Sequence, residues 1–224
     1  VVLRQLPTFS VMHQLFHDEM PRTHLNAGAI IEPECLMEEV LAYVGDPSKL
    51  TVSNNAAVVS KSAKEIEKAM VDRIGSTGKG TGGAIAQKLL RHPEAVFKGA
   101  MIGTPDYDQF RLAHGVYDLN VDMNAEIAHD RKTVLAEVSQ GFSLSLNAGG
   151  FYPFCTSRDC TVGQAMSDAG VHPLMFRDCA MVVRTFPIRV AGNSGPCYAD
   201  QKELDWEDLG QTPELTTVTQ KVRR

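Results

Sequence analysis

The sequence predicts an α/β domain with a largely parallel central sheet flanked by helices. Short β-branched, apolar runs alternate along the 224 residues with segments whose apolar side chains recur at helical spacing, a pattern typical of strand–helix–strand units. Hydrophobic residues make up 43% and charged residues 22%, close to the average of soluble globular proteins. No internal repeat or low-complexity linker divides the chain, so we expect a single α/β domain over residues 1–224.

Composition also excludes several classes of protein. No apolar run approaches the ~20 residues of a membrane span, and no charged start followed by a hydrophobic stretch indicates a signal peptide. The net charge of −5 argues against a broad nucleic-acid surface but leaves room for a local cationic pocket. The five cysteines are odd in number and scattered, which favours free thiols in a reducing cytoplasm. We therefore expect a cytoplasmic protein with neither nucleic acid nor membrane as a partner.

In the first third of the chain, strand patterns alternate with one helix. Pro33 and the apolar spacing after it predict a helix over Glu34–Val44, which Gly45-Asp46-Pro47 ends. Apolar or β-branched residues predict extended segments at Val1–Leu6, Ala29–Ile31, Thr51–Val52 and Ala56–Val59.

Three further helices and three further strands follow from the same patterns. Ser62 with Glu65 forms a capping box for a helix over Ala63–Ile74. Helices are also expected over Ala84–Arg91, which Pro93 closes, and over Thr161–Ala169. Continuous apolar runs predict buried strands at Val96–Ile102, Thr133–Val138 and Ala180–Val190.

The segment Gly75–Gly83 is the strongest candidate for a binding site. Its glycines allow positive φ and a close approach of backbone N–H groups to an anion, and Ser76, Thr77 and Lys79 add donors. It leads into a helix N-terminus, which favours phosphate. It is not a Walker A loop, and its GxGxxG match (Gly78–Gly83) follows a helix where a dinucleotide site requires a strand. A surface loop without a ligand is the alternative.

Two other loops are candidates. Glu137–Gly141 follows a predicted strand, and the amide of Gln140 could pair with a purine edge; a Gln that satisfies loop backbone is the alternative. Tyr152–Asp159 brings hydroxyls and Arg158 in front of a helix, which fits either a second anion site or an ordinary N-cap by Ser157 or Asp159.

The cysteines and histidines do not form a recognisable site. Cys155 and Cys160 lie near each other in sequence without a neighbouring His, so buried thiols are favoured over zinc ligands. The seven histidines show no HExxH or paired spacing, so we expect no metal ligand among the residues of this chain.

Taken together, these blocks resemble the adenylosuccinate synthetase family, in particular its shorter archaeal and phage members, which include the phage 2-aminoadenylosuccinate synthetases. The resemblance covers most of the chain in ordered blocks: Asn26–Pro33, Gly75–Gly80, Glu137–Gly141, Phe151–Asp159, Arg184–Pro196 and Glu214–Thr219.

The resemblance implies a ligase of purine nucleotide biosynthesis. GTP or ATP, with Mg²⁺, would phosphorylate the 6-oxo group of a purine monophosphate (IMP, or dGMP in the phage type), and the amine of L-aspartate would displace that phosphate. It also implies a homodimer. In this role Ser76, Thr77, Gly78, Lys79 and Thr156 would hold the 5′-phosphate, and Arg91 would reach it from the neighbouring subunit.

The remaining roles that the resemblance implies concern the base, the ribose and aspartate. Gln140 would contact the base, and Val190 and Ala191 would line the ribose. Thr219 and Arg223 would approach the aspartate carboxylates, with Lys221 nearby.

Some motifs of the family have no counterpart in this sequence. These are the N-terminal glycine-rich loop with its Mg²⁺ and triphosphate contacts and catalytic acid, the segment with the catalytic His, and the C-terminal guanine-binding Lys-x-Asp. We therefore expect the central portion of a longer enzyme, inactive on its own and without identifiable catalytic residues. The alternatives are a non-catalytic purine-monophosphate binder, one piece of a split enzyme and, against the helix-before-loop order, a Rossmann-type oxidoreductase.

Overall fold

The computed structural model describes residues 3–97, 117–118, 127–128, 132–190, 192–216 and 220–223. Contacts divide the chain into two compact units. Unit 1 comprises Val1–Ser60, Ala84–Ser139 and Val162–Arg177, and unit 2 comprises Lys61–Gly83, Gln140–Thr161 and Asp178–Arg224. Compact units can unfold together, so the single domain expected from the sequence stays a prediction.

The strands of unit 1 form two small parallel sheets. In the first sheet, β3 (Leu50–Val52) lies between β1 (Thr23–Leu25) and β5 (Tyr117–Asp118). In the second, β2 (Ile30–Ile31) pairs with β4 (Ala57–Val58). Every one of these pairings is parallel, which confirms the predicted α/β class with helices connecting parallel strands.

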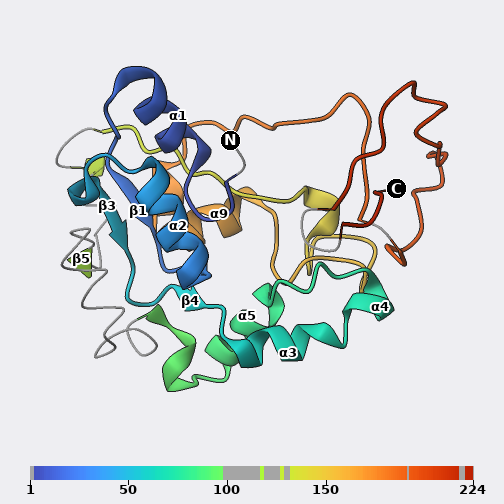
Figure 1. The fold of residues 1–224 in the computed structure, drawn as a ribbon, viewed down its shortest axis with the longest axis horizontal. Helices are drawn as coiled ribbons and strands as arrows, with labels where there is room; N and C mark the ends of the chain where they lie inside the picture. The colour runs from blue at the N-terminus through green and yellow to red at the C-terminus, as the bar shows by residue number, and fades with distance from the viewer. Residues whose placement is uncertain are drawn as a thin grey trace. The chain divides into compact units, whose positions relative to one another are not determined.

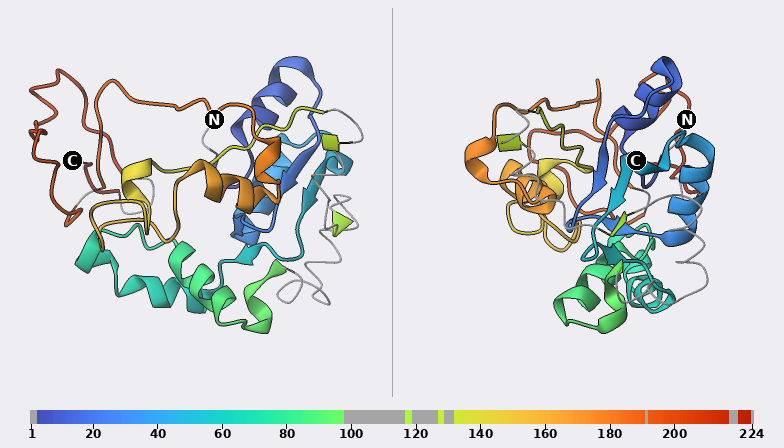
Figure 2. Two further views of the ribbon diagram at one scale, coloured as in Figure 1. Left: turned by 180° about the vertical axis from the view of Figure 1, so that it is seen from behind. Right: turned by 90° about the vertical axis from the view of Figure 1, so that its left-hand side faces the viewer.

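Helices cover both sides of these strands (Figure 1). The helix α2 (Pro33–Tyr43) and the helix α9 (Val162–Ala169) lie on opposite sides, as the three views agree (Figure 2), and α1 (Thr8–His17) packs against α2. Between them lies one hydrophobic core, made up of Leu6, Val11, Leu25, Ile31, Leu36, Val40, Leu50, Val52, Ala56, Val58 and Phe97. Pro33 begins α2 as predicted, and β2, β3, β4 and α9 lie within or beside their predicted ranges.

The strand predicted at Val1–Leu6 is wrong for the residues that the structure describes. The backbone N–H groups of Arg4, Gln5 and Leu6 all donate to the carboxylate of Glu39, at 2.6, 3.0 and 2.8 Å. Glu39 is buried in α2. Since this one side chain takes the donors that a strand would offer to a neighbour, the segment bends instead of extending.

Unit 2 contains α3 (Lys61–Lys68), α4 (Val71–Ile74), the first residues of α5 (Thr81–Leu89) and a 3₁₀ turn, η3 (Phe142–Leu144). The single helix predicted over Ala63–Ile74 is therefore wrong in one respect. It breaks after Lys68, where the N–H of Met70 donates to Glu67 O in a tight turn.

Two long strand predictions are also wrong. Residues 132–139 and 178–190 belong to no strand, and Val182 is 99% exposed. A β-branched run becomes a strand only where a neighbouring chain supplies ladder partners, and no described residue pairs with these segments. Of Val96–Ile102, Val96 forms an antiparallel bridge with Ala57, whereas residues 98–102 lie outside the described residues.

Short 3₁₀ turns complete the described chain: η1 (Pro47–Lys49), η2 (Pro93–Ala95) and η4 (Pro173–Met175). Within the described residues, no helix has both the length and the apolar character needed to cross a membrane.

Candidate functional site

The glycine-rich loop joins two helices of unit 2. It leaves α4 at Gly75, which has a φ of 64°, and turns again at Gly78, with a φ of 67°, where the N–H donates to Ser76 Oγ at 3.2 Å. Both glycines adopt the left-handed conformation that other residues avoid. Because a helix and not a strand precedes the loop, the geometry of a Rossmann dinucleotide site is absent here.

The two glycines that open α5 pack against their neighbours. A Cβ atom added at Gly83 would overlap the carbonyl oxygen of Ala63 in α3, and one at Gly82 would lie 2.6 Å from Ser157 Oγ. The start of α5 is thus wedged between the backbone of α3 and the segment that carries Ser157, so two of the predicted phosphate-binding blocks meet at this point.

The carboxylate of Glu67 occupies the amides at the end of the loop. This side chain, on α3, is buried and accepts hydrogen bonds from the N–H groups of Gly80 and, at 3.4 Å, Gly82. The sequence predicted that the helix N-terminus would favour a phosphate. In the structure these two amides are taken by an internal anion, which leaves the Ser76–Gly78 portion of the loop for a ligand.

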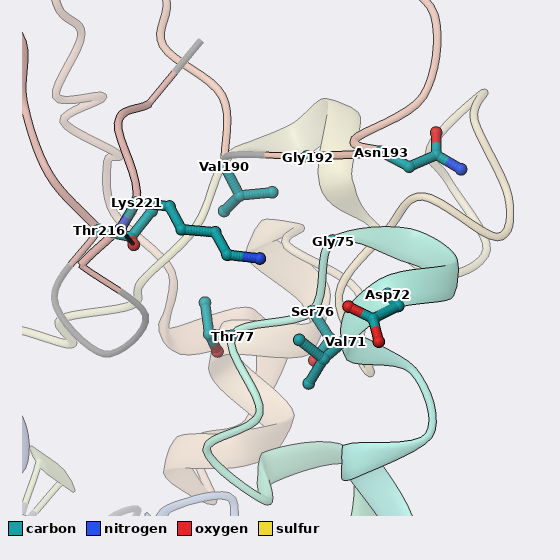
Figure 3. Close-up of a pocket in the computed structure, with 10 residues that line it drawn as sticks. All are labelled: Val71, Asp72, Gly75, Ser76, Thr77, Val190, Gly192, Asn193, Thr216 and Lys221. Carbon is teal, nitrogen blue, oxygen red and sulfur yellow. Dashed lines mark hydrogen bonds between the residues drawn. The ribbon is translucent and has the colours of Figure 1, made fainter.

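A pocket of about 420 Å³, open to solvent, lies beside this portion of the loop in unit 2. Figure 3 shows the side chain of Lys221 extending into the space between Val190 and Thr77. The full lining is Val71, Asp72, Gly75, Ser76, Thr77, Val190, Gly192, Asn193, Thr216 and Lys221. One ammonium, several hydroxyls and two valines can accommodate a small anion with an apolar attachment.

A short antiparallel turn positions Lys221. Leu215 bridges Val222, the N–H of Thr216 donates to Lys221 O at 2.8 Å, and the N–H of Lys221 donates to Thr216 Oγ1 at 3.0 Å. Glu214 anchors the turn through two hydrogen bonds from Arg184, at 2.8 and 3.3 Å. These bonds lower the pKa of Glu214 and raise that of Arg184, as a bidentate ion pair should.

The segment around Thr156 is held by its own hydrogen bonds. The N–H of Thr156 donates to Leu144 O at 2.8 Å, and that of Cys160 to the buried Ser145 Oγ at 2.9 Å. Asp159 accepts from the side chain and backbone of Asn147 and from the backbone of Ala148. The Asn147 side chain, its backbone and then Ala148 lower the pKa of Asp159. The carboxylate of Asp159 therefore fastens a loop, and the N-cap role suggested for it is wrong.

The loop predicted to contact the base is arranged differently from the expectation. Glu137 does not follow a strand; its carboxylate accepts from the N–H groups of Thr8 and Phe9 at 2.9 and 2.6 Å and so caps α1. Gln140 is exposed and has a φ of 77°.

Arg91 ends α5 in a position that normally belongs to glycine. Its φ is 60°, its N–H donates to Lys88 O at 3.0 Å, and the N–H of His92 donates to Gln87 O at 3.1 Å. This is the Schellman arrangement with Arg91 at its left-handed residue. The exposed guanidinium of Arg91 belongs to unit 1.

The pocket therefore brings together part of the predicted set. Ser76, Thr77, Val190 and Lys221 line it, whereas Ala191 and Thr219 lie outside the described residues. The other predicted site residues are not among its lining: Gly78, Lys79, Arg91, Gln140, Thr156 and Arg223.

Sequence reasoning missed several members of the lining. Asp72 and Val71 gave no signal, because they belong to a region predicted as ordinary helix. Asn193 and Thr216 stand inside two of the blocks that carry the family resemblance and could have been found there.

The cysteines are free thiols. Burial raises the pKa of Cys155 and Cys160, so neither has the thiolate character of a nucleophile. Within the described part of the chain, no three His, Cys, Asp or Glu side chains lie together as a metal site.

Comparisons with known proteins agree on one family. The model of the adenylosuccinate synthetase family matches residues 105–224. The N6-succino-2-amino-2'-deoxyadenylate synthase of Vibrio phage phiVC8 is 41% identical over 211 residues, which cover 92% of this chain and 60% of that protein. The adenylosuccinate synthetase of Thermococcus sibiricus is 31% identical, with coverage of 99% and 61%.

A solved structure shows the same fold. The succinoaminodeoxyadenylate synthetase of cyanophage S-2L, bound to dGMP and to dATP as an energy donor, superposes with a TM-score of 0.75 at 35% identity, covering 92% of this chain and 59% of that one. The chain thus spans about 60% of the length of the relatives that it matches. The ordered blocks, the parallel α/β fold and these similarities lead to one conclusion: the chain belongs to the adenylosuccinate synthetase family.

Proposed function

We propose that this protein acts in purine nucleotide biosynthesis as a ligase that joins L-aspartate to the 6-oxo position of a purine monophosphate. The triphosphate donor phosphorylates O6, and the aspartate amine displaces that phosphate. The observation that carries the proposal is the pocket beside the glycine loop, where Thr77 and Lys221 converge in a chain of this family. An ammonium and hydroxyl donors suit a phosphate dianion.

We propose dGMP, rather than IMP, as the monophosphate. The phage synthase named above is 41% identical to this chain and the archaeal adenylosuccinate synthetase 31%. The cyanophage relative was solved with dGMP and dATP, which favours an adenine nucleotide over GTP as the donor.

Within this proposal, the residues of unit 2 divide the substrate between them. Ser76, Thr77 and Lys221 bind the 5′-phosphate, and Val190 packs against the sugar. Gln140 pairs with the base, and Arg223 and Thr219 serve aspartate, in line with the family resemblance.

Two parts of the proposal rest on the resemblance alone. Arg91 would complete the phosphate site of a second subunit in a homodimer. Mg²⁺ would accompany the triphosphate, but the described residues offer no cluster of three carboxylate, imidazole or thiolate ligands that fits it, so no step of the reaction is assigned to them through the metal.

Binding to the 224-residue chain is the first test. Calorimetric titration should give saturable binding of dGMP and an affinity for dAMP, which lacks the 6-oxo group, at least about tenfold lower, since an unpaired buried polar group costs about 1–3 kcal/mol. The variant Lys221→Ala should weaken dGMP about tenfold through loss of a charged hydrogen bond. Lys202→Ala, an exposed lysine of the same unit, is the matched control. Equal affinity for dGMP and dAMP would contradict the assignment.

A chimaera tests the chemistry. Residues 1–224 would replace the matching segment of the cyanophage S-2L synthetase, and aspartate-dependent formation of a succinylated nucleotide from dGMP would be measured. Activity with IMP but not with dGMP would overturn the choice of substrate.

A further inference from the structure

The carboxylate of Glu67 lies beneath the loop that the proposed function uses for phosphate. Glu67 is 7% exposed, and its two oxygens accept from the N–H groups of Gly80 and Gly82. We infer that Glu67 is a positioning residue for this loop: it holds the loop in the shape that presents Thr77 to the substrate phosphate. This inference rests on the proposed function.

The environment of Glu67 supports a specific role for its charge. Burial of a carboxylate is unfavourable unless hydrogen bonds and an opposite charge compensate. No described cation forms an ion pair with Glu67, so the compensation comes from backbone amides at the N-terminus of α5, where the helix dipole is positive. A glutamine in its place would lose the charge and could accept through only one oxygen.

The hydrogen bonds of Glu67 fix one end of the phosphate segment. Gly75 begins the loop at the end of α4, and Gly80 ends it on the Glu67 carboxylate. Between these two points lie Ser76 to Lys79, with Thr77 facing the pocket. A segment tied at both ends loses less conformational entropy when the ligand binds.

Glu67 also lies next to the second predicted phosphate block. A Cβ atom on Gly82 would be 3.5 Å from Glu67 Oε1 and 2.6 Å from Ser157 Oγ. Glu67, Gly82 and Ser157 therefore form one cluster, and a shift of the α5 start would disturb both the Thr77 loop and the segment beside Thr156. A residue that acts through two loops should affect recognition of phosphate more than recognition of the nucleoside.

The test compares Glu67→Gln with Glu65→Gln on the 224-residue chain. Glu65 lies on the same helix, is exposed and pairs with Lys68 at 3.7 Å, so its variant controls for loss of one negative charge. Both would be titrated with dGMP and with deoxyguanosine. We expect Glu67→Gln to weaken dGMP about tenfold and deoxyguanosine less than twofold, and Glu65→Gln to change neither. Glu67→Asp, which keeps the charge but is one methylene shorter, should fall between wild type and Glu67→Gln.

Amide hydrogen exchange provides a readout that needs no ligand. Exchange at Gly80 should accelerate about tenfold or more in Glu67→Gln and stay at the wild-type rate in Glu65→Gln. If Glu67→Gln fails to fold, Glu67→Asp carries the same two measurements.

Each failure has a different meaning. If the wild type binds no dGMP, the proposed function fails, while exchange at Gly80 still decides whether Glu67 holds the loop. If the wild type binds dGMP and Glu67→Gln leaves it unchanged, tightens it, or weakens dGMP and deoxyguanosine equally, the positioning role is overturned and the proposed function stands.

Discussion

Arg91 keeps a side chain where the backbone favours none. Its φ of 60° places it in the left-handed region at the end of α5, which costs a non-glycine residue roughly 1–2 kcal/mol. Arg91→Gly should therefore raise the free energy of unfolding by about 1 kcal/mol, measured by urea denaturation. If the guanidinium serves a partner's phosphate, the same variant should weaken dGMP in the dimer. An Arg91→Gly dimer that binds dGMP as tightly as the wild-type dimer would contradict that role.

Gln140 permits a test of base recognition. Its side chain is exposed in the structure, so Gln140→Leu should leave the free energy of unfolding within about 0.5 kcal/mol of wild type. We expect dGMP affinity to fall about tenfold, because the base edge would lose its hydrogen-bonding partner, at about 1.4 kcal/mol per tenfold change. Ribose 5-phosphate has no base and should bind as before. Calorimetry with both ligands decides, and equal losses would indicate a damaged fold.

Residue-level prediction succeeded where the chemistry is local to one segment. Ser76 and Thr77 could be placed at the pocket because they stand among glycines that shape a loop. Glu137 and Glu67 could not be assigned, since their hydrogen-bond partners lie 129 and 13 residues away in sequence. A carboxylate in a sequence looks the same whether it meets a ligand or a distant backbone amide.

At the scale of elements, α1 depends on a distant cap. The helix begins after Pro7, whose ring offers no side-chain acceptor, and Glu137 supplies the acceptor instead. Glu137→Ala should lower the free energy of unfolding by about 1 kcal/mol, the usual effect of losing a cap. Urea denaturation measures it, and amide exchange at Thr8 and Phe9 should accelerate. Glu94→Ala, an exposed acid of the same unit, should not change either quantity.

The loop of residues 142–161 should respond to pH through Asp159. The pKa of Asp159 is lower in the fold than in the unfolded chain, so its contribution to stability is present above the ordinary carboxylate pKa and is lost as pH falls through the lowered value. The stability difference between wild type and Asp159→Asn should therefore be largest at neutral pH and shrink in acid. Thermal unfolding at a series of pH values checks this, and a difference that grows in acid would contradict it.

The elements that were predicted correctly have local reasons to form. Pro33 opens α2, and glycines bracket the loop between α4 and α5. The strand prediction at residues 180–190 failed because local β propensity cannot reveal whether a neighbouring strand is available. The helix α1 was missed because its cap lies far away in the chain.

At the scale of the whole molecule, one apolar run stands out. Met181, Val182 and Val183 are 75, 99 and 80% exposed, and extended, uncharged segments of this kind promote aggregation. Val182→Lys should raise the concentration at which the chain aggregates, measured by light scattering, without lowering the midpoint of thermal unfolding. Val58→Lys, at a buried position of β4, should unfold the protein. If Val182→Lys also unfolds it, the run is packed in solution.

The family was predictable from several ordered blocks, although no single block was specific. The glycine loop alone fits a phosphate site, a dinucleotide fingerprint or a plain surface loop. Only the order and spacing of Asn26–Pro33, Gly75–Gly80 and Arg184–Pro196 reduced these alternatives to one. The pocket lining was less predictable, because Asp72 and Lys221 become neighbours only after unit 2 folds.

The crowded start of α5 bears on how this protein tolerates variation. A library that samples every amino acid at both opening glycines should return nearly only glycine at position 83, where the obstacle is the backbone oxygen of Ala63. Position 82 should also accept alanine, because the obstacle there is the hydroxyl of Ser157, which can rotate away. Two adjacent codons would thus carry very different mutational loads, and Gly82→Ala should become neutral when Ser157 is itself replaced by glycine.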